Sequence, residues 1–115
     1  MPNVLFVCAR NQWRSPTAEK LFANVPNINV ASAGLSSKSK RRVSHKILDW
    51  ADIVYVMEKK HRERILETFG NEDSLPPIVS LDIPDNYQFM DPDLIEILEG
   101  QVRPLLDDLV RANGG

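Results

Sequence analysis

The sequence predicts an α/β fold in three layers, α/β/α, with a four-stranded parallel sheet as the middle layer. Short apolar runs alternate along the chain with segments in which apolar residues recur at a helical period, an order typical of βαβ units. Successive residues of these runs are apolar, as in strands buried on both faces of a sheet. The 115 residues, 43% hydrophobic and 26% charged, suit one globular domain spanning residues 1–115.

The N-terminal part of the chain is predicted to form a strand, a helix and a second strand. Residues 3–7 (NVLFV) are a continuous apolar run and indicate a buried strand. Ser15 followed by Pro16 is typical of a helix N-cap with proline at the first helical position. Residues 27–33 (NINVASA) indicate the second strand, which Gly34 ends.

The middle of the chain continues the alternation. Residues 43–50 are predicted to form a short helix with Trp50 among its inward-facing side chains, and the dense apolar run 51–57 (ADIVYVM) a third strand. Residues 58–69 follow as a polar helix closed by glycine. Both histidines, His45 and His61, lie in polar helical surroundings and are predicted to be exposed, without a catalytic or metal-binding role.

The C-terminal part supplies the fourth strand and the last helical segment. Residues 78–83 (IVSLDI) are predicted as the strand, and Asp91 with Pro92 as the N-cap and first residue of a helix. Gly100 and Pro104 should bend or break this helix, because proline removes a helical hydrogen bond and clashes with the preceding turn.

A candidate site follows from this topology. In open parallel sheets, ligands bind outside the carboxyl ends of the strands. Cys8, Gly34, Met57 and Asp85 all fall at or just beyond the predicted strand ends. We therefore expect the functional residues of this protein to gather at that edge of the sheet.

Residues 8–15 (CARNQWRS) form the loop that leaves the first strand and enters a helix. Backbone N–H groups of such a loop and the helix dipole favour a bound anion, and Arg14 adds a planar fork suited to phosphate oxygens. Cys8, the only cysteine, would lie under this anion, where its thiolate is stabilised and its pKa falls below the usual value of about 8.5. The loop therefore predicts a phosphate-binding site with a thiolate nucleophile.

The loop matches the Cys-x5-Arg-Ser signature of protein tyrosine phosphatases. Its place at the start of the chain resembles the low-molecular-weight protein tyrosine phosphatase family. Further similarity lies in residues 31–35 (ASAGL), 51–65 (ADIVYVMEKKHRERI) and 83–87 (IPDNY), in the order of that family. The chain resembles a short variant, with residues missing between Gly34 and Ala51.

The resemblance implies a two-step phosphatase that needs no cofactor or metal. Cys8 would attack the phosphoryl group and Asp85 would protonate the leaving oxygen, then activate the water that releases inorganic phosphate. Arg14 would hold the phosphate oxygens, and Ser15 would donate a hydrogen bond to the Cys8 sulfur. The remaining loop residues are predicted to bind the substrate: Ala9, Arg10, Asn11, Gln12 and Trp13.

Two aspartates compete for the role of general acid. Asp85 matches the family's acid when its Asp-Asn-Tyr is laid on the family's Asp-Pro-Tyr, and Tyr87 would then flank the substrate ring. Asp91 also precedes a proline, but its sequence is that of a helix N-cap. Asp85 is the predicted acid, with Asp91 as the alternative.

Some loop residues depart from the family pattern. Trp13 replaces the family's second loop cysteine, so the protective disulfide of its members is not available to Cys8. Arg10 and Gln12 replace a small and an apolar residue and add bulk and charge at the mouth of the site. Asn11 matches the family's loop asparagine, a residue type that tolerates unusual backbone angles in tight turns.

The predicted substrate is a phosphotyrosine protein or a small aryl phosphate. A net charge of −2 argues against a nucleic-acid partner, and residues 38–42 (KSKRR) are interpreted as a solvated surface, with a patch for an anionic partner as the alternative. No apolar stretch is long enough for a membrane span, so we expect a cytoplasmic protein.

Two other functions stay open at this point. The first is a catalytically weak module that binds phosphoproteins through the same loop. The second is an arsenate reductase of similar fold, whose thiol relay needs more cysteines than the single Cys8. Oligomeric state and physiological substrate are not determined by the sequence.

Overall fold

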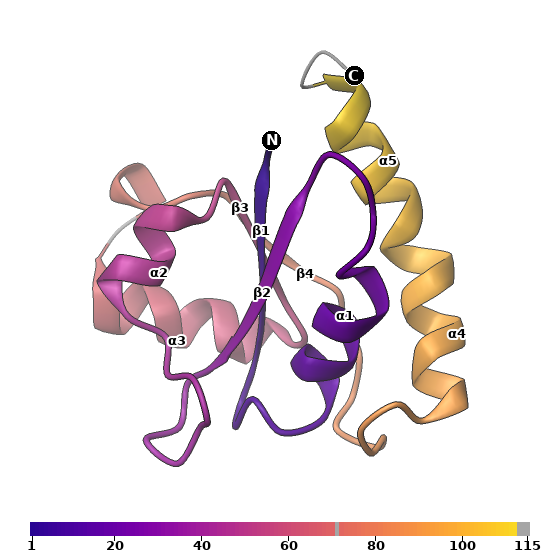
Figure 1. Cartoon of the computed structure of the whole chain (residues 1–115). Helices are drawn as coiled ribbons and strands as arrows, with labels where there is room; N and C mark the ends of the chain where they lie inside the picture. The colour runs from indigo at the N-terminus through magenta and orange to yellow at the C-terminus, as the bar shows by residue number, and fades with distance from the viewer. Residues whose placement is uncertain (71, 113–115) are drawn as a thin grey trace.

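A computed structural model describes residues 1–70 and 72–112. A four-stranded parallel sheet runs through its middle in the order β2-β1-β3-β4, which confirms the predicted fold class (Figure 1). The strands are β1 (Asn3–Cys8), β2 (Asn29–Gly34), β3 (Ile53–Val56) and β4 (Ile78–Ser80).

Helices cover both faces of the sheet (Figure 1). One face carries α1 (Arg14–Phe22), α4 (Pro92–Gln101) and α5 (Arg103–Ala112); the other carries α2 (His45–Trp50) and α3 (Lys59–Phe69). A short 3₁₀ turn, η1 (Glu72–Ser74), precedes β4. Within the part of the chain described here, no helix has the length and apolar character needed to cross a membrane.

The central strand β1 is buried on both sides because its alternate residues enter two different cores. Phe6 packs toward α1, where its ring stacks with those of Phe22 and Tyr55 at centroid distances of 6.1 and 5.8 Å. Leu5, together with the residue two positions after it in β1, belongs to the core under α2 and α3. Cys8 lies on the same face as Phe6, so its side chain is directed toward α1.

Helix α1 begins two residues earlier than predicted. Trp13 occupies the N-cap position, and Ser15 lies inside the first turn, so the prediction of Ser15 as N-cap was wrong. The Ser15 hydroxyl is directed to the Cys8 sulfur instead of capping the helix. Pro16 is accommodated because N–H groups of the first turn have no partner within the helix.

Strand β4 ends at Ser80, three residues before the predicted end. Asp82 adopts a positive φ of 56°, which is incompatible with a regular strand. The chain nevertheless stays beside β3, because the N–H groups of Leu81 and Ile83 donate to the carbonyl oxygens of Val56 and Met57 at 2.8 and 2.7 Å.

The last helical segment breaks as predicted, with α4 ending at Gln101 and α5 beginning at Arg103. The predicted capping role of Asp91 is also confirmed. Its Oδ1 accepts a hydrogen bond of 2.9 Å from the N–H of Asp93, and Pro92 is the first helical residue.

Two predictions of burial were wrong. Trp50 is 36% exposed, because the short helix α2 buries only Leu48 completely and ends at this tryptophan. His61 is buried rather than exposed, with 3% of its surface accessible. Its Nδ1 accepts a hydrogen bond of 3.1 Å from the N–H of Glu58 and so completes a capping box at the start of α3.

Candidate active site

The loop between β1 and α1 has backbone N–H groups available for a ligand at the carboxyl edge of the sheet. The carbonyl oxygens of Cys8 and Ala9 point away from this site and accept hydrogen bonds from the N–H groups of Leu35 and Ser36, at 3.2 and 2.7 Å. None of the N–H groups of residues 9–13 donates a hydrogen bond to another residue that the structure describes. The loop is therefore a cradle of available donors, which suits an anion.

The N-terminus of α1 opens into the same cradle. No side chain caps this helix. The carbonyl oxygen of its N-cap residue, Trp13, accepts hydrogen bonds from the backbone N–H and the hydroxyl group of Thr17. The uncapped first turn leaves further N–H groups and the positive end of the helix dipole at the site. Both effects favour a negatively charged ligand.

Asn11 fixes the turn of the loop. Its backbone is left-handed, with φ of 53°, which agrees with the prediction for this position. The buried side chain donates from Nδ2 to the hydroxyl oxygens of Ser15 and Ser32, at 3.0 and 2.9 Å. Ser32 in turn donates to Oε1 of Glu19 at 2.6 Å, so the network that holds the loop continues into β2 and α1.

The sulfur of Cys8 lies 2.9 Å from the hydroxyl oxygen of Ser15, and both residues are buried. The Ser15 oxygen accepts from Asn11, and its one proton has two acceptors within reach, the sulfur at 2.9 Å and the carbonyl oxygen of Ala33 at 3.4 Å, of which the sulfur is nearer. The thiolate, the form of a cysteine that attacks electrophiles, would accept a hydrogen bond from Ser15 at this position.

The side chain of Arg14 is buried, and two acceptors outside the loop bind its guanidinium. Its Nη1 donates to Oε2 of Glu58 at 2.7 Å and to the carbonyl oxygen of Ile83 at 2.8 Å. Its Nε lies 3.6 Å from Oδ1 of Asp85. The two acceptors on Nη1 fix the position of the guanidinium, and Arg14 lines the pocket together with Cys8 and Asp85.

Glu58 was not predicted as a site residue, although it follows β3 at the carboxyl edge where the site was expected. Burial alone would raise the pKa of its carboxyl, but the hydrogen bond and charge of Arg14, with smaller contributions from Lys60 and His61, lower the pKa below its usual value. Glu58 is therefore a carboxylate that pairs with Arg14.

His61 lies behind this pair. Burial and the positive charge of Arg14 lower the pKa of the imidazole to about 4. The Nε2 atom lies 3.8 Å from Oε2 of Glu58. Among the residues that the structure describes, this Nε2 is the one buried side-chain nitrogen or oxygen that has no hydrogen-bond partner. His61 is neutral at pH 7 and supports Glu58 from α3.

Gly34 allows the loop to lie against the end of β2. A Cβ atom at this position would lie 2.6 Å from the backbone N of Asn11 and 2.7 Å from the backbone C of Arg10, and would also collide with the side chain of Ser39. Only glycine lets these two backbones approach so closely.

A small pocket of about 210 Å³ opens at the cradle. It brings together Cys8, Arg14 and Asp85, the three residues predicted to be catalytic. The rest of its wall is formed by loop residues that the sequence predicted to bind the substrate: Ala9, Arg10, Gln12 and Trp13.

Three other predicted residues lie outside this wall. Asn11 and Ser15 are buried beneath the loop, where they bond to one another. Tyr87 is half-buried and packs against the core cluster between the sheet and α1, α4 and α5. Of the two competing aspartates, Asp85 lines the pocket, whereas Asp91 caps α4.

Comparison with known proteins shows what this chain resembles. Residues 3–50, which include the loop and β2, match the model of the family described as low molecular weight phosphotyrosine protein phosphatase. The chain is 29% identical to the low molecular weight protein-tyrosine-phosphatase Wzb of Escherichia coli K12, over 75% of this chain and 78% of that protein. It is also 28% identical to the protein-arginine-phosphatase of Bacillus subtilis 168, over 59% of this chain and 63% of that protein.

Solved structures share the fold over nearly the whole chain. The tyrosine phosphatase Wzb from Escherichia coli K30, in complex with phosphate, superposes with a TM-score of 0.74 at 20% identity and covers 93% of this chain and 97% of its own. The YwlE arginine phosphatase from Geobacillus stearothermophilus gives a TM-score of 0.71 at 23% identity, covering 99% of this chain and 94% of its own.

Proposed function

We propose that this chain is a cysteine-based phosphatase of the low-molecular-weight phosphotyrosine protein phosphatase family, whose model residues 3–50 match, and that it hydrolyses aryl phosphate monoesters, and in proteins phosphotyrosine. The observation that carries this proposal is the convergence of Cys8, Arg14 and Asp85 on one pocket beneath the uncapped N-terminus of α1. This arrangement supplies a nucleophile, an anion clamp and a proton donor within one small volume.

In the first step the Cys8 thiolate attacks phosphorus. A sulfur–phosphorus bond forms while the bond from phosphorus to the aryl oxygen breaks, and Asp85 transfers its proton to the leaving phenol oxygen. Arg14 and the loop N–H groups bind the three non-bridging oxygens, whose charge they stabilise through the transition state. The products of this step are the free phenol and a phosphocysteine.

In the second step a water molecule attacks the phosphocysteine. Asp85, now a carboxylate, accepts a proton from the water, and the sulfur–phosphorus bond breaks to release inorganic phosphate. Ser15 donates its hydrogen bond to the departing sulfur, which restores the thiolate. Each turnover therefore consumes one water and regenerates both Cys8 and the protonated Asp85.

The charge at the mouth of the pocket favours phosphotyrosine over phosphoarginine. Arg10 and Arg14 both line the pocket, so a substrate guanidinium would meet two positive charges beside the one carboxylate of Asp85. The indole of Trp13 is 37% exposed and offers an apolar surface for a neutral aromatic ring. We therefore propose tyrosine, rather than arginine, as the dephosphorylated residue.

The proposal is tested by hydrolysis of a simple aryl phosphate in the presence of a chelator. The wild-type chain should release inorganic phosphate and Cys8→Ser should not, and the rate on a phosphotyrosine peptide should exceed that on a phosphoarginine peptide. A wild-type rate no higher than that of Cys8→Ser would refute the enzyme. Saturable binding of phosphate without turnover would instead indicate the phosphoprotein-binding module.

A further inference from the structure

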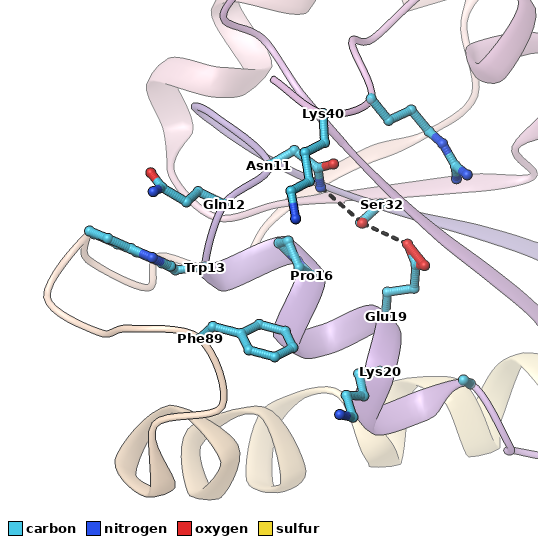
Figure 2. A pocket seen from close by; sticks show the side chains of 11 residues that line it. Asn11, Gln12, Trp13, Pro16, Glu19, Lys20, Ser32, Lys40 and Phe89 are labelled. Carbon is cyan, nitrogen blue, oxygen red and sulfur yellow. Dashed lines mark hydrogen bonds between the residues drawn. The ribbon is translucent and has the colours of Figure 1, made fainter. Parts of the chain in front are cut away.

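A second and larger hollow, of about 730 Å³, lies beside the catalytic loop along α1 (Figure 2). Gln12 and Trp13 line both this hollow and the catalytic pocket. The two spaces therefore share a wall, and a substrate whose phosphate sits over Cys8 can extend past Trp13 into the hollow. We call this hollow the flanking groove.

The flanking groove has apolar side chains that remain exposed. Trp13 and Phe89 are 37% and 45% exposed, and both line it. In Figure 2 the ring of Phe89 points toward the hollow from the loop before α4, below Pro16, and Trp13 forms the rim on the side of the loop. Exposed aromatic rings at the edge of a hollow are typical of surfaces that bind another molecule.

The flanking groove is also positively charged. Lys20, Lys40 and Arg41 line it, against a single carboxylate, that of Glu19, which already accepts a hydrogen bond of 2.6 Å from Ser32. Figure 2 shows the Lys40 side chain extending into the hollow, and the Nζ atom of Lys20 lies 5.7 Å from the centre of the Phe89 ring. Three cations thus gather here in a chain whose net charge is −2.

We propose that the flanking groove binds the peptide segment next to the phosphorylated residue and selects substrates with aspartate or glutamate in that segment. This inference rests on the proposed phosphatase function. Carboxylates of the segment would pair with Lys20, Lys40 and Arg41, while its apolar side chains contact Trp13 and Phe89.

A peptide fits these observations better than a nucleic acid. A nucleic-acid strand carries a phosphate at every nucleotide and is bound along an extended row of cations. The flanking groove offers three cations close to the carboxylate of Glu19, on a protein of negative net charge. Such a limited cluster suits a segment with one to three carboxylates.

The test uses two phosphotyrosine peptides that differ only in the residues flanking the phosphotyrosine, glutamates in one and glutamines in the other. We expect kcat/KM to be about tenfold higher for the acidic peptide at low salt, the effect of two or three exposed ion pairs. The preference should disappear at about 1 M salt, where the screening length falls to about 3 Å.

Variants connect the preference to the groove. In Lys20→Gln/Lys40→Gln the ratio of kcat/KM between the acidic and the neutral peptide should fall well below the wild-type ratio and toward one, because two of the three facing charges are lost. The matched control is Lys46→Gln, which removes an exposed lysine from α2 on the opposite face of the sheet and should keep the wild-type ratio.

The outcomes separate this inference from the proposed function. If both peptides are hydrolysed at equal rates, the inference is overturned and the phosphatase function stands. If wild type hydrolyses neither peptide faster than Cys8→Ser does, the phosphatase function fails. The affinities of Cys8→Ser for the two peptides then test the flanking groove: tighter binding of the acidic peptide supports it, and equal binding overturns it. Faster hydrolysis of a phosphate-ended oligonucleotide than of the acidic peptide would assign the groove to nucleic acid and overturn the inference.

Discussion

The hydroxyl oxygen of Ser15 lies 2.9 Å from the sulfur of Cys8 and accepts a hydrogen bond from the side chain of Asn11. A serine hydroxyl can donate or accept, but a thiolate has no proton, so Ser15 is the donor whenever Cys8 is in its thiolate form. The direction matters in both proposed steps, because the sulfur must be a thiolate to attack and must accept negative charge again when it leaves.

Replacement of Ser15 by alanine should slow both the attack of the Cys8 thiolate on phosphorus and its release from the phosphocysteine. A hydrogen bond to a charged group contributes about 1.5–3 kcal/mol, so we expect kcat for an aryl phosphate to fall about 10- to 100-fold. Alkylation of Cys8 by iodoacetate should slow as well, and phosphocysteine should accumulate during turnover. Ser37→Ala, at an exposed loop serine, is the control. An unchanged alkylation rate in Ser15→Ala would contradict the role of donor.

The two aspartates should respond differently to substitution. Asp85→Asn removes the proposed proton donor at the pocket and should lower kcat about 10²- to 10⁴-fold, with the larger losses for phenols that are poor leaving groups. Asp91→Ala removes the cap of α4 and should cost about 1 kcal/mol of unfolding free energy. Rates on a series of aryl phosphates and urea denaturation measure the two effects. The reverse ranking would make Asp91 the acid.

Gly34 and Gly100 offer a matched pair for the packing of the loop. An alanine Cβ at Gly34 would collide with the backbone of Arg10 and Asn11, so Gly34→Ala should cost about 1–3 kcal/mol of unfolding free energy and displace the phosphate cradle. Nothing lies within 4 Å of a Cβ at Gly100, inside α4. Gly100→Ala should therefore raise the unfolding free energy by about 0.5–1 kcal/mol. Denaturation curves and the affinity for phosphate distinguish the two variants. If Gly34→Ala and Gly100→Ala had the same stability and phosphate affinity, the close approach of the loop backbone to Gly34 would be contradicted.

The fold and the place of the site were predictable because their determinants are local. The apolar runs are long enough to identify the strands, and the carboxyl ends of parallel strands always lie on one edge. Cys8 and Gly34 are accordingly paired in the register of β1 and β2, at the ends of both strands. Left-handed Asn11 was also predictable, since its residue type and the tight turn agree.

Features that depend on contacts between distant segments were not predictable. The Ser15-Pro16 pair has the local pattern of a helix start, but the bond from Ser15 to Cys8 places the start at Arg14. Nothing in the polar sequence of α3 indicates that His61 is buried beside Glu58, whose carboxylate pairs with Arg14, 44 residues earlier in the chain. Tertiary contacts overrode the local pattern in both cases.

The pairing of Glu58 with Arg14 predicts a loss of substrate binding when the carboxylate is removed. Glu58→Gln keeps the shape and the cap of α3 but removes the charge that holds the guanidinium. We expect about a 3- to 10-fold loss of kcat/KM, the effect of about 1 kcal/mol on the position of Arg14. Glu63→Gln, at an exposed position of the same helix, should match wild type. Equal kinetics for Glu58→Gln and Glu63→Gln would show that Arg14 does not need the carboxylate.

The buried imidazole of His61 should make the stability of the protein depend on pH. Its pKa in the folded chain is about 4, below the value of 6.5 for an unperturbed histidine, because burial and the charge of Arg14 outweigh the attraction of Glu58 and Asp85. Between these two values the unfolded chain binds a proton that the folded chain does not bind. The free energy of unfolding should therefore fall as the pH is lowered from about 6.5 to about 4, by up to about 3 kcal/mol.

His61→Gln isolates this contribution. Glutamine at the third position of α3 can still accept the N–H of Glu58 and complete the capping box, but it has no proton to bind in this range. The unfolding free energy of His61→Gln, measured in urea at several pH values, should therefore decline less than that of wild type between pH 6.5 and 4. His45→Gln removes the other histidine, which is exposed on α2, and serves as the control. If His61→Gln and wild type lose stability in parallel, the imidazole is not the group that titrates, because the cap is present in both chains and only the proton-binding site differs.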